Sequence, residues 1–310
     1  MIEIFKTVSD KLTKTDQLDA GVWVNLVNPS EEEVSYVCNA INLDCDYVKA
    51  ALDEEESSRL EVDEGITLII VDIPIFNNIV NPVNYSTIPL GIILANDIIV
   101  TVCLKESPII RDFIENRVKT FYTFKKTRFI LQILYRNAIK YLQYLKQIDK
   151  ESSCIENELH KSTKNKEIIQ LLALEKSLVY FSTSLKANEL VLEKLMRQES
   201  IKNYPEDAEL LEDAIIENKQ AIEMAKIYSD ILSGTMGAFA SVISNNLNIV
   251  MKFLASITIV MAVPTMVASF FGMNVIVPMQ SNYFAFAYIL GGTLLFCLIA
   301  AMVMAKRKMF

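Results

Sequence analysis

The sequence predicts an α+β soluble domain that leads, through a long helical stalk, into a hairpin of two transmembrane helices. Three observations support this fold class. Residues 1–115 alternate β-branched runs with helical stretches, and residues 116–252 are helical in pattern with a single proline. Residues 253–305 then contain no Asp, Glu, Lys, Arg or His. Because a bilayer-spanning helix needs about 20 mostly apolar residues, this last tract holds two spans and a short turn.

Charge is concentrated in the first part of the chain. The net charge is −8, and no acidic residue follows Asp230. An acidic domain argues against nucleic acid as a partner, because that affinity comes from Lys and Arg on phosphates. It fits either an ordinary solvated surface or a surface that concentrates cations. The five cysteines form no CxxC pair, which indicates reduced thiols and a cytoplasmic domain.

The N-terminal domain is expected to hold one sheet with helical cover. Four apolar, β-branched runs bounded by Gly, Pro or Asn predict strands. They are Gly21–Val27, Ile66–Ile73, Leu90–Leu94 and Asp97–Leu104. A helix is expected to begin after Ser30, a candidate N-cap, with Glu33 completing a capping box. The sequence does not specify the strand order.

Three long helices are expected after the sheet. Apolar residues at three- and four-residue steps predict helices over Phe129–Ile148 and Ile168–Met196, which fold back on each other. Pro205 marks the start of a third helix with acidic residues in its first turn. If that helix continues to Phe271, it spans roughly 100 Å at 1.5 Å per residue. Such a helix cannot be buried in a small globule, so we interpret it as a stalk that enters the membrane.

The membrane part divides into a first span, Phe253–Phe271, a short uncharged loop, and a second span, Tyr283–Ala305. Basic residues flank the spans, and by the positive-inside rule both ends of the hairpin lie in the cytoplasm and the loop lies outside. The complete division is 1–115 for the α/β domain, 116–204 for the helical hairpin, 205–252 for the stalk, 253–271, 272–282 and 283–305 for the membrane hairpin, and 306–310 for a basic cytoplasmic tail.

One face of the stalk and first span carries small or neutral polar side chains at helical steps. They are Ser241, Ser244, Asn248, Met251, Ala255, Thr258, Ala262, Thr265 and Ser269. The opposite face carries Phe253, Ile257, Val260, Val263, Val267 and Phe270. Such a row allows either close packing of two membrane helices or the lining of a water-filled pore. Hydroxyl and amide groups could bond the water shell that Mg²⁺ retains, and several copies in cyclic symmetry would be needed to enclose a pore.

A Gly-Met-Asn triplet stands at the end of the first span. Gly272, Met273 and Asn274 are followed by a short loop, a second span and a basic end, and in this context the triplet resembles the CorA family of magnesium channels. Three further segments agree with that family. They are Asn248–Lys252 (NIVMK), Pro264-Thr265 and the acidic segment Leu52–Glu61 (LDEEESSRLE). The resemblance covers essentially the whole chain, and the C-terminal third is its most specific part.

The resemblance implies a homopentamer with a funnel-shaped cytoplasmic domain, whose stalk helix becomes the pore helix. It places Gly272, Met273 and Asn274 at the outer mouth, with Asn274 in contact with a hydrated ion. The implied pore residues are Asn248, Met251, Leu254, Ala262 and Thr265, to which the periodicity adds Ala255, Thr258 and Ser269. The residues that fit a basic ring are Lys306, Arg307 and Lys308. The implied partners are further copies of the chain, membrane lipid and divalent cations, with no cofactor and with Mg²⁺ as the transported ion and as a candidate regulatory ion.

Two departures from the family pattern bear on regulation and on ion capture. Family members often carry an acidic stalk residue where this chain has Gly237, which puts gating by intracellular Mg²⁺ at that position in doubt. The loop Val275–Asn282 lacks the acidic residues common in relatives. The soluble domain also contains four consecutive acidic residues. They form either a solvated helix face or a regulatory metal site. They are Asp53, Glu54, Glu55 and Glu56.

The expected function is passive Mg²⁺ influx across the cell membrane, driven by the membrane potential. Transport of Co²⁺, Ni²⁺ or Zn²⁺ is the alternative within the same superfamily, although softer metals prefer thiolate and imidazole, which the predicted pore face lacks. A membrane-anchored sensor or structural protein, whose stalk merely oligomerises, is an alternative of another class. The sequence contains no Walker A, GxSxG or HExxH pattern, so an enzyme is not expected.

Overall fold

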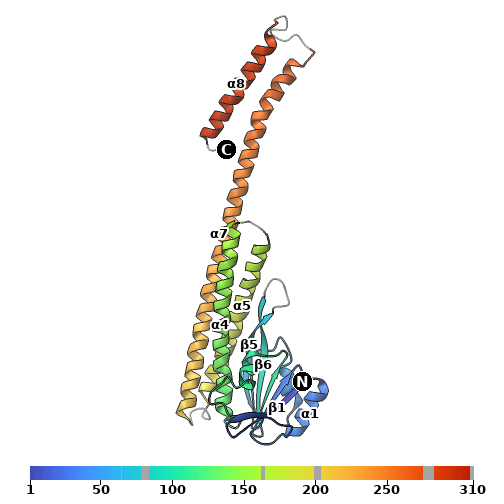
Figure 1. Cartoon of the computed structure of the whole chain (residues 1–310), viewed down its shortest axis with the longest axis vertical. Coiled ribbons are helices and arrows are strands. Elements are labelled where there is room, and N and C mark those ends of the chain that lie inside the picture. Colours follow the sequence, from blue (N-terminus) through green and yellow to red (C-terminus); the bar gives the residue numbers. More distant parts are fainter. Residues whose placement is uncertain (64, 78–83, 162–164, 199–203, 275–282, 308–310) are drawn as a thin grey trace. The chain divides into compact units, whose positions relative to one another are not determined.

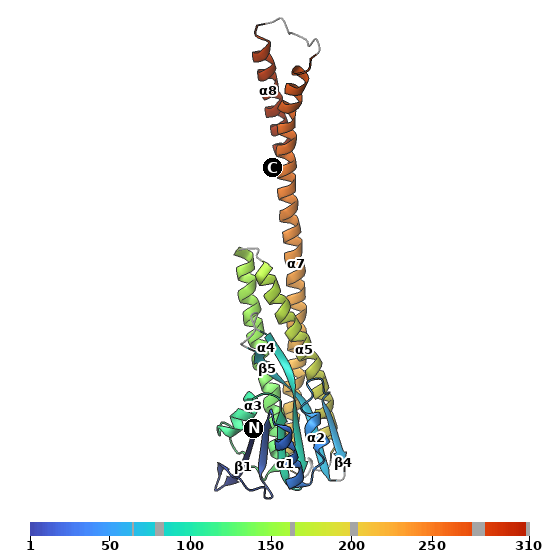
Figure 2. The ribbon, with the colours of Figure 1, turned by 90° about the vertical axis from the view of Figure 1, so that its right-hand side faces the viewer.

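The structure is a computed structural model of the chain. It describes residues 1–310 except 64, 78–83, 162–164, 199–203, 275–282 and 308–310. The described residues belong to two compact units, Met1–Gly234 and Thr235–Phe310. The first unit contains a sheet with helices on both of its faces, and the second contains two helices (Figure 1 and Figure 2).

The sheet of the first unit has seven strands within the described residues, in the order β2-β1-β3-β7-β6-β5-β4. β3 and β7 pair in parallel, and the other neighbouring strands pair antiparallel. The strands are β1 (Ile2–Val8), β2 (Lys11–Lys14), β3 (Trp23–Val27), β4 (Arg59–Asp63), β5 (Ile66–Asn77), β6 (Asn84–Ala95) and β7 (Ile98–Cys103). The long hairpin of β5 and β6 therefore forms one side of a mixed sheet.

The sequence predicts four of these strands, β3, β5, β6 and β7, and the structure confirms all four. It does not indicate β1, β2 or β4. β2 and β4 lie at the two edges of the sheet, and most of their side chains are exposed or half-buried. An edge strand needs no apolar run, so its sequence carries little of the signal that predicts a buried strand.

Helices on both faces of the sheet give the first unit three layers (Figure 2). α1 and α2 pack on one face, while α3, α4, α5 and the start of α7 pack on the other. Their bounds are α1 Glu31–Ile41, α2 Cys45–Ala50, α3 Pro108–Ile114, α4 Lys126–Lys161, α5 Asn165–Met196 and α7 Pro205–Phe271. The predicted capping box of α1 is confirmed, because the Ser30 hydroxyl accepts from the Glu33 amide at 3.2 Å and the Glu33 carboxylate accepts from the Ser30 amide at 2.9 Å.

Each face of the sheet has its own apolar core. Trp23 of β3 is fully buried in the larger core, where its ring lies 5.1 Å from that of Phe129. Its indole N–H donates to the Thr101 hydroxyl at 2.8 Å, so the polar end of the ring is satisfied. On the other face Gly91 leaves room for α2, because a Cβ at this position would clash with the Cβ of Ala51. The close approach of α2 to the sheet explains this glycine.

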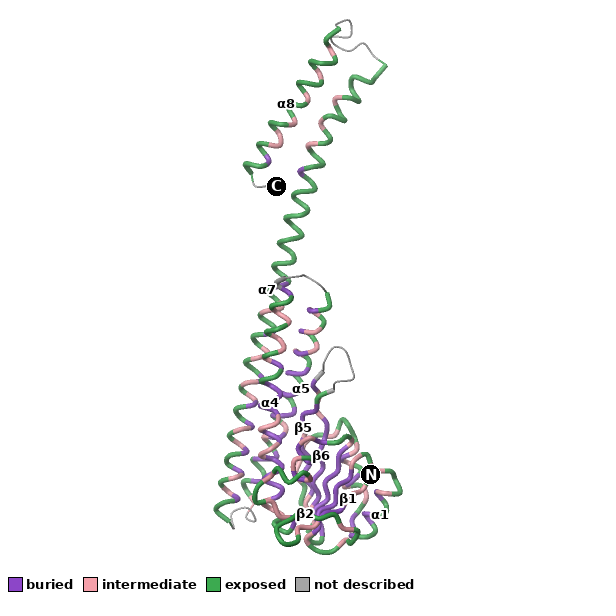
Figure 3. Tube along the Cα trace, viewed as in Figure 1, coloured by how far each residue is buried: buried purple, intermediate pink, exposed green. Residues whose placement is uncertain are grey.

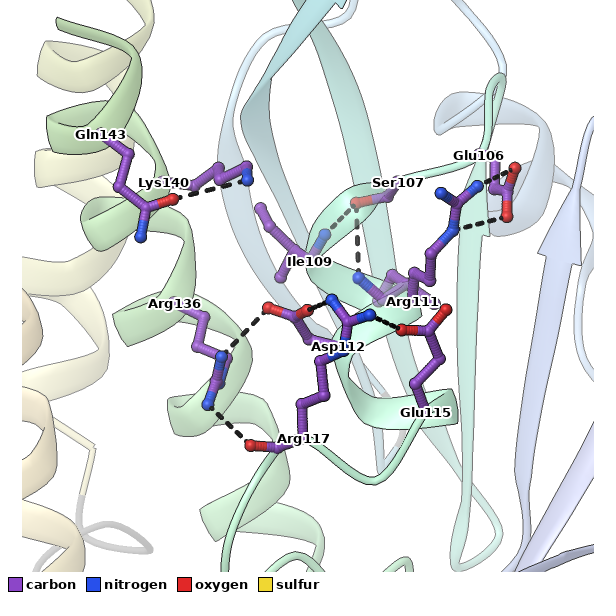
Figure 4. Close-up of polar contacts among 11 residues, drawn as sticks. Glu106, Ser107, Ile109, Arg111, Asp112, Glu115, Arg117, Arg136, Lys140 and Gln143 are labelled. Carbon is purple, nitrogen blue, oxygen red and sulfur yellow. Dashed lines mark hydrogen bonds and ion pairs between the residues drawn. The ribbon is translucent and has the colours of Figure 1, made fainter. Parts of the chain in front are cut away.

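An ion pair and a hydrogen bond, both from Arg136, attach the short helix α3 and the turn after it to α4 (Figure 4). Arg136 of α4 donates to the Asp112 carboxylate at 3.1 Å and to the Arg117 carbonyl at 3.5 Å. Arg117 itself lies 3.5 Å from Asp112, and Arg111 pairs with Glu106. These side chains are substantially exposed, so each pair contributes about 0–1 kcal/mol and their main role is to orient α3.

Side chains cover the edge of β5 beyond the end of its pairing with β4. Asn188 of α5 donates to the Asp72 carbonyl at 2.8 Å and accepts from the Asp72 amide at 2.9 Å. Asn137 and Tyr141 of α4 donate to the same carbonyl at 2.8 and 3.2 Å. The backbone groups of β5 that β4 does not pair with are thereby hydrogen-bonded, as buried backbone groups must be. We call these four residues, together with Ser184 of α5, the edge cluster.

The first part of α7 is packed into the first unit. Its buried apolar residues there are Leu211, Ala214, Ala221, Ala225 and Leu232. Asn218, which is also buried, donates to the carbonyl of Leu185 in α5 at 3.0 Å. Near the start of the helix, Arg128 of α4 pairs with Glu206 and Asp207. α7 is therefore attached to both helices of the α4–α5 hairpin.

The second unit contains the remainder of α7, from Thr235, and α8 (Ala285–Lys306). α7 passes Pro264 without interruption and ends at Phe271, where the sequence predicts the end of the first span. Most residues of these two helices are exposed (Figure 3). Ser256 is an exception, because it is fully buried.

Candidate functional site

Both helices of the second unit are long and apolar enough to cross a membrane. Their most apolar 18-residue windows have mean hydropathies of 2.0 in α7 and 2.3 in α8, and only 6% and 0% of these windows are buried within the chain. The core helices of soluble proteins hide such surfaces. Exposed apolar helices of this length therefore indicate that lipid or other chains surround them.

A shallow groove of about 690 Å³ follows one side of α7 in the second unit. Its lining residues are Ile257, Thr258, Met261, Ala262, Thr265, Met266, Ser269 and Phe270. Four of the predicted pore residues, Thr258, Ala262, Thr265 and Ser269, are among them. The structure thus places this part of the polar row on one continuous face of the helix.

The threonine hydroxyls of this groove donate hydrogen bonds to backbone carbonyls of the same helix. Thr258 donates to the carbonyl of Leu254 at 2.8 Å, and Thr265 donates to the carbonyl of Met261 at 3.1 Å. A hydroxyl has one proton and two lone pairs, so each of these oxygens presents only acceptor capacity to its surroundings. No charged side chain is among the residues that line the groove. The groove is therefore a neutral surface that accepts hydrogen bonds at its two threonines.

The groove is wider than the sequence indicates. Ile257 and Phe270, predicted on the opposite face, border it instead, because residues adjacent in sequence are only about 100° apart around a helix. Met261 and Met266 also line it and were not predicted. Their three- and four-residue spacing from the hydroxyl residues was a usable signal, but the prediction considered mainly small and polar side chains.

The other predicted pore residues lie on α7 before the groove. They are Asn248, Met251, Leu254 and Ala255. All four are exposed, and none is among the residues that line the groove. They extend the predicted row along the same helix, and the described contacts of a single chain do not gather them into a cavity with the groove residues.

α7 uses a different face to contact α8. Val260, Val263 and Val267 are half-buried, and the Cys297 thiol of α8 lies 3.7 Å from the carbonyl of Val260. An apolar groove of about 610 Å³ between the two helices includes Val263 and Val267. For these three valines, the predicted separation of an apolar face from the polar row is confirmed.

The Gly-Met-Asn triplet ends α7. The amide of Gly272 donates to the Ala268 carbonyl at 2.9 Å, and a Cβ on this glycine would lie 3.1 Å from the same oxygen, which is tighter than an ordinary contact. The amide of Met273 bonds to the carbonyl of Phe270 at 3.4 Å. Met273 and Asn274 are exposed beyond this turn. The predicted loop that follows lies outside the described residues.

Basic residues end α8. Lys306 is its last residue, and the amide of Arg307 caps the helix by bonding to the carbonyls of Val303 and Ala305. Both basic side chains are exposed, in a position where positive charge complements the helix dipole. Lys308, the third member of the predicted basic ring, lies outside the described residues.

The acidic segment after α2 is largely engaged in local contacts. The Asp53 carboxylate accepts from the Glu55 amide at 3.0 Å, and Glu56 forms an ion pair with Arg59. Glu54 is exposed. Within the described part of the chain, no three or more His, Cys, Asp or Glu side chains gather in a way that could hold a metal ion. A regulatory metal site at this segment stays a prediction.

The fold and the groove define a class of protein. A mixed α/β unit leads into one long helix, α7, whose apolar end bears a neutral polar face, and a second apolar helix, α8, follows. This is an integral membrane protein with a soluble domain on a two-helix hairpin. The model of the CorA-like Mg²⁺ transporter protein family matches residues 19–307. The chain therefore belongs to this family, as the Gly-Met-Asn triplet predicts, and the family is one of transport proteins.

Known proteins agree with this assignment. The cobalt/magnesium transport protein CorA of Methanocaldococcus jannaschii is 29% identical over 262 residues, which are 82% of this chain and 80% of the relative. The complete structure of the CorA magnesium transporter from that organism covers 99% of this chain and 98% of its own, with a TM-score of 0.84 and 24% identity. The ZntB cytoplasmic domain from Vibrio parahaemolyticus covers 79% of this chain and 96% of its own, with a TM-score of 0.60 and 14% identity. The predicted soluble domain, stalk and membrane hairpin are thus a known fold.

Proposed function

We propose that this chain is a subunit of a passive channel in which several copies of α7 surround a pore that conducts Mg²⁺ into the cell. The observation that carries the proposal is the groove of α7, whose threonine hydroxyls offer only acceptors and whose lining residues carry no charge. Membership of the CorA-like Mg²⁺ transporter family supports Mg²⁺ as the transported ion.

The chemistry of the ion explains why a neutral acceptor surface suits it. Mg²⁺ gives up its water shell reluctantly, and the waters that it polarises point their protons outward. The hydroxyl oxygens of Thr258 and Thr265 can accept those protons while the shell stays intact. Neutral groups also hold the ion weakly enough to release it, as conduction requires. A membrane potential of 100 mV would then drive each divalent ion with about 4.6 kcal/mol.

The assembly follows from the incompleteness of one chain. One α7 presents a single face and cannot enclose a pore, so closed cyclic symmetry is needed, and the family resemblance makes the assembly a homopentamer. Asn248 and Met251 would continue the lining toward the inner end, and the Gly272–Asn274 triplet would form the outer mouth. Both termini would lie in the cytoplasm and the hairpin in the cell membrane, with the basic end of α8 inside.

Co²⁺ is a second candidate for the transported ion. The M. jannaschii relative is named a cobalt/magnesium transport protein. A surface that contacts the water shell rather than the metal discriminates weakly between hydrated ions of the same charge. Zn²⁺ is less well matched, because the residues that line the groove include no thiolate or imidazole.

Uptake into liposomes by the purified protein tests this proposal, with Mg²⁺, Co²⁺ and Zn²⁺ compared. The double variant Thr258→Val/Thr265→Val keeps the shape of the groove and removes both acceptors. The loss of two hydrogen bonds to a charged species, about 1.5 kcal/mol or more each, predicts a fall in Mg²⁺ uptake of at least roughly a hundredfold.

The matched control is Thr293→Val on α8, where the threonine hydroxyl donates to the carbonyl of Ile289 at 2.7 Å in the same way. This threonine lines the groove between α7 and α8. Its loss should leave uptake close to that of the wild type. Normal uptake by a folded, oligomeric Thr258→Val/Thr265→Val protein would contradict the pore assignment.

A further inference from the structure

The edge cluster contains a carboxyl group that the proposed transport mechanism does not use. Asp72 stands on β5 and is half-buried beneath α5. Burial raises the pKa of this carboxyl above its ordinary value, and a hydrogen bond from Ser184 partly opposes the rise. A carboxylate in such surroundings is ordinarily paired with a cation or bonded by several donors.

The groups that surround Asp72 are neutral. α4 contributes Tyr141, whose hydroxyl donates to the Asp72 carbonyl and whose own pKa is raised by burial and by the charge of Asp72. α5 contributes Ser184 and Asn188, and β6 contributes Thr87, whose hydroxyl lies 3.0 Å from that of Ser184. Among the described residues, no Lys, Arg or His bonds to the Asp72 carboxyl or shifts its pKa. An ionised Asp72 therefore has no positive partner there.

The edge cluster is connected to α7 through one turn of α5. Ser184 bonds to Thr87 of β6 and Asn188 bonds to Asp72 of β5, and between them the carbonyl of Leu185 accepts from Asn218 of α7 at 3.0 Å. Ser184, Asn188 and Asn218 are 4%, 2% and 3% exposed, so water does not replace their hydrogen bonds. Movement of this turn would change the support of α7, which is the helix that later carries the groove.

We propose that Asp72 is a proton-binding regulatory group whose ionisation favours opening of the α5 turn from Ser184 to Asn188, and so loosens the attachment of α7. An ionised carboxylate gains water when the turn opens, whereas a protonated carboxyl loses little by staying covered. The closed state is therefore favoured at low pH, and the open state gains population as pH rises through the raised pKa of Asp72. Any effect on ion flux rests on the proposed function, but the opening itself does not.

Hydrogen exchange of the full chain in lipid nanodiscs, over a pH series that starts near the ordinary aspartate pKa of about 3.9, tests the proposal. Asp72→Asn has nearly the same shape and cannot ionise, and comparison at each pH cancels the intrinsic exchange rates. Peptides containing the α5 turn and Asn218 should lose protection in the wild type relative to Asp72→Asn as pH rises. The expected loss is about tenfold for each unit by which the pKa is raised.

The matched control is the exposed Asp213 of α7. Asp213→Asn should follow the wild-type exchange profile across the whole pH series. Identical profiles for the wild type and Asp72→Asn would overturn the proposal. Exchange is measured without ion transport, so this result and a failure of the proposed channel function are distinguishable.

Ser184→Ala provides a second variant in case Asp72→Asn does not fold. Removing the hydroxyl removes a hydrogen bond that favours the carboxylate, so the pKa of Asp72 should rise further. The pH-dependent loss of protection in the α5 turn should then become larger and end at a higher pH than in the wild type, so that its midpoint moves upward. A midpoint that is unchanged or moves to lower pH would overturn the proposal as well.

Discussion

The two units of the molecule use the same kinds of polar side chain in opposite ways. In the first unit Asn188 and Asn218 are buried, and each bonds to a backbone carbonyl of another element. In the second unit Thr258 and Thr265 lie on the open face of an apolar helix. A buried polar group costs several kcal/mol unless it is paired, so the first set serves stability. A polar face left open on a membrane helix instead marks contact with water or with other chains.

The largest effect is expected from the buried asparagines of the first unit. Asn188→Ala leaves the amide of Asp72 and the hydroxyl of Ser58 without their partner and removes one of the three donors to the Asp72 carbonyl, which should destabilise the first unit by about 3 kcal/mol. Trp23 is the single tryptophan and is buried in this unit, so its fluorescence during denaturant unfolding reports the change. Asn157→Ala, at an exposed position of α4, is the control. If the free energy of unfolding falls no more than in the control, the edge cluster does not stabilise the packing of α5 on the sheet.

The next largest effect is expected at the predicted outer mouth, among the exposed polar side chains of the second unit. Asn274 presents a neutral amide beyond the end of α7, where a hydrated ion would enter. Asn274→Ala removes one hydrogen bond to a charged species, about 1.5–3 kcal/mol, which predicts a fall in Mg²⁺ uptake of about tenfold to a hundredfold. Size-exclusion chromatography should show an unchanged oligomer. Near-normal uptake by this variant would show that Asn274 of the Gly-Met-Asn triplet does not take part in ion entry.

The smallest effect compares two faces of the same helix. In a background without the five native cysteines, Thr265→Cys lies in the groove and Val263→Cys lies toward α8. Because a thiol reacts as the thiolate, which needs water, a hydrophilic thiol reagent should modify position 265 on the order of tenfold faster. Equal rates, or faster reaction at position 263, would show that the groove does not face water in the assembled protein.

Local patterns predicted the parts of the fold that depend on neighbouring residues. The capping box at Ser30 is confirmed because both of its bonds join residues three apart. The edge cluster could not be predicted in this way, since Asp72 and Asn188 are 116 residues apart. Asp72 also stands within an apolar run, where one polar residue is compatible with an exposed position on a strand. No local pattern distinguishes that position from one covered by a helix.

The groove shows the same limit on a smaller scale. Thr258 and Thr265 were predicted on one face because polar residues at helical steps stand out within an apolar span. Met261 and Met266 line the same groove at three- and four-residue steps from the hydroxyl residues, but an apolar methionine does not stand out within an apolar span as a polar residue does. Periodicity therefore identified the centre of the face, while its width depended on side-chain shape.

The backbone bonds of Thr258 and Thr265 have a consequence for which sign of charge can pass. Each hydroxyl dipole points its negative end away from the helix. Its lone pairs repel an anion, but they accept hydrogen bonds from the water shell of a hydrated cation. Residues 253–305 contain no Asp, Glu, Lys, Arg or His that could supply the same preference through charge. Rejection of chloride would then come from oriented dipoles, which a change of protonation does not remove.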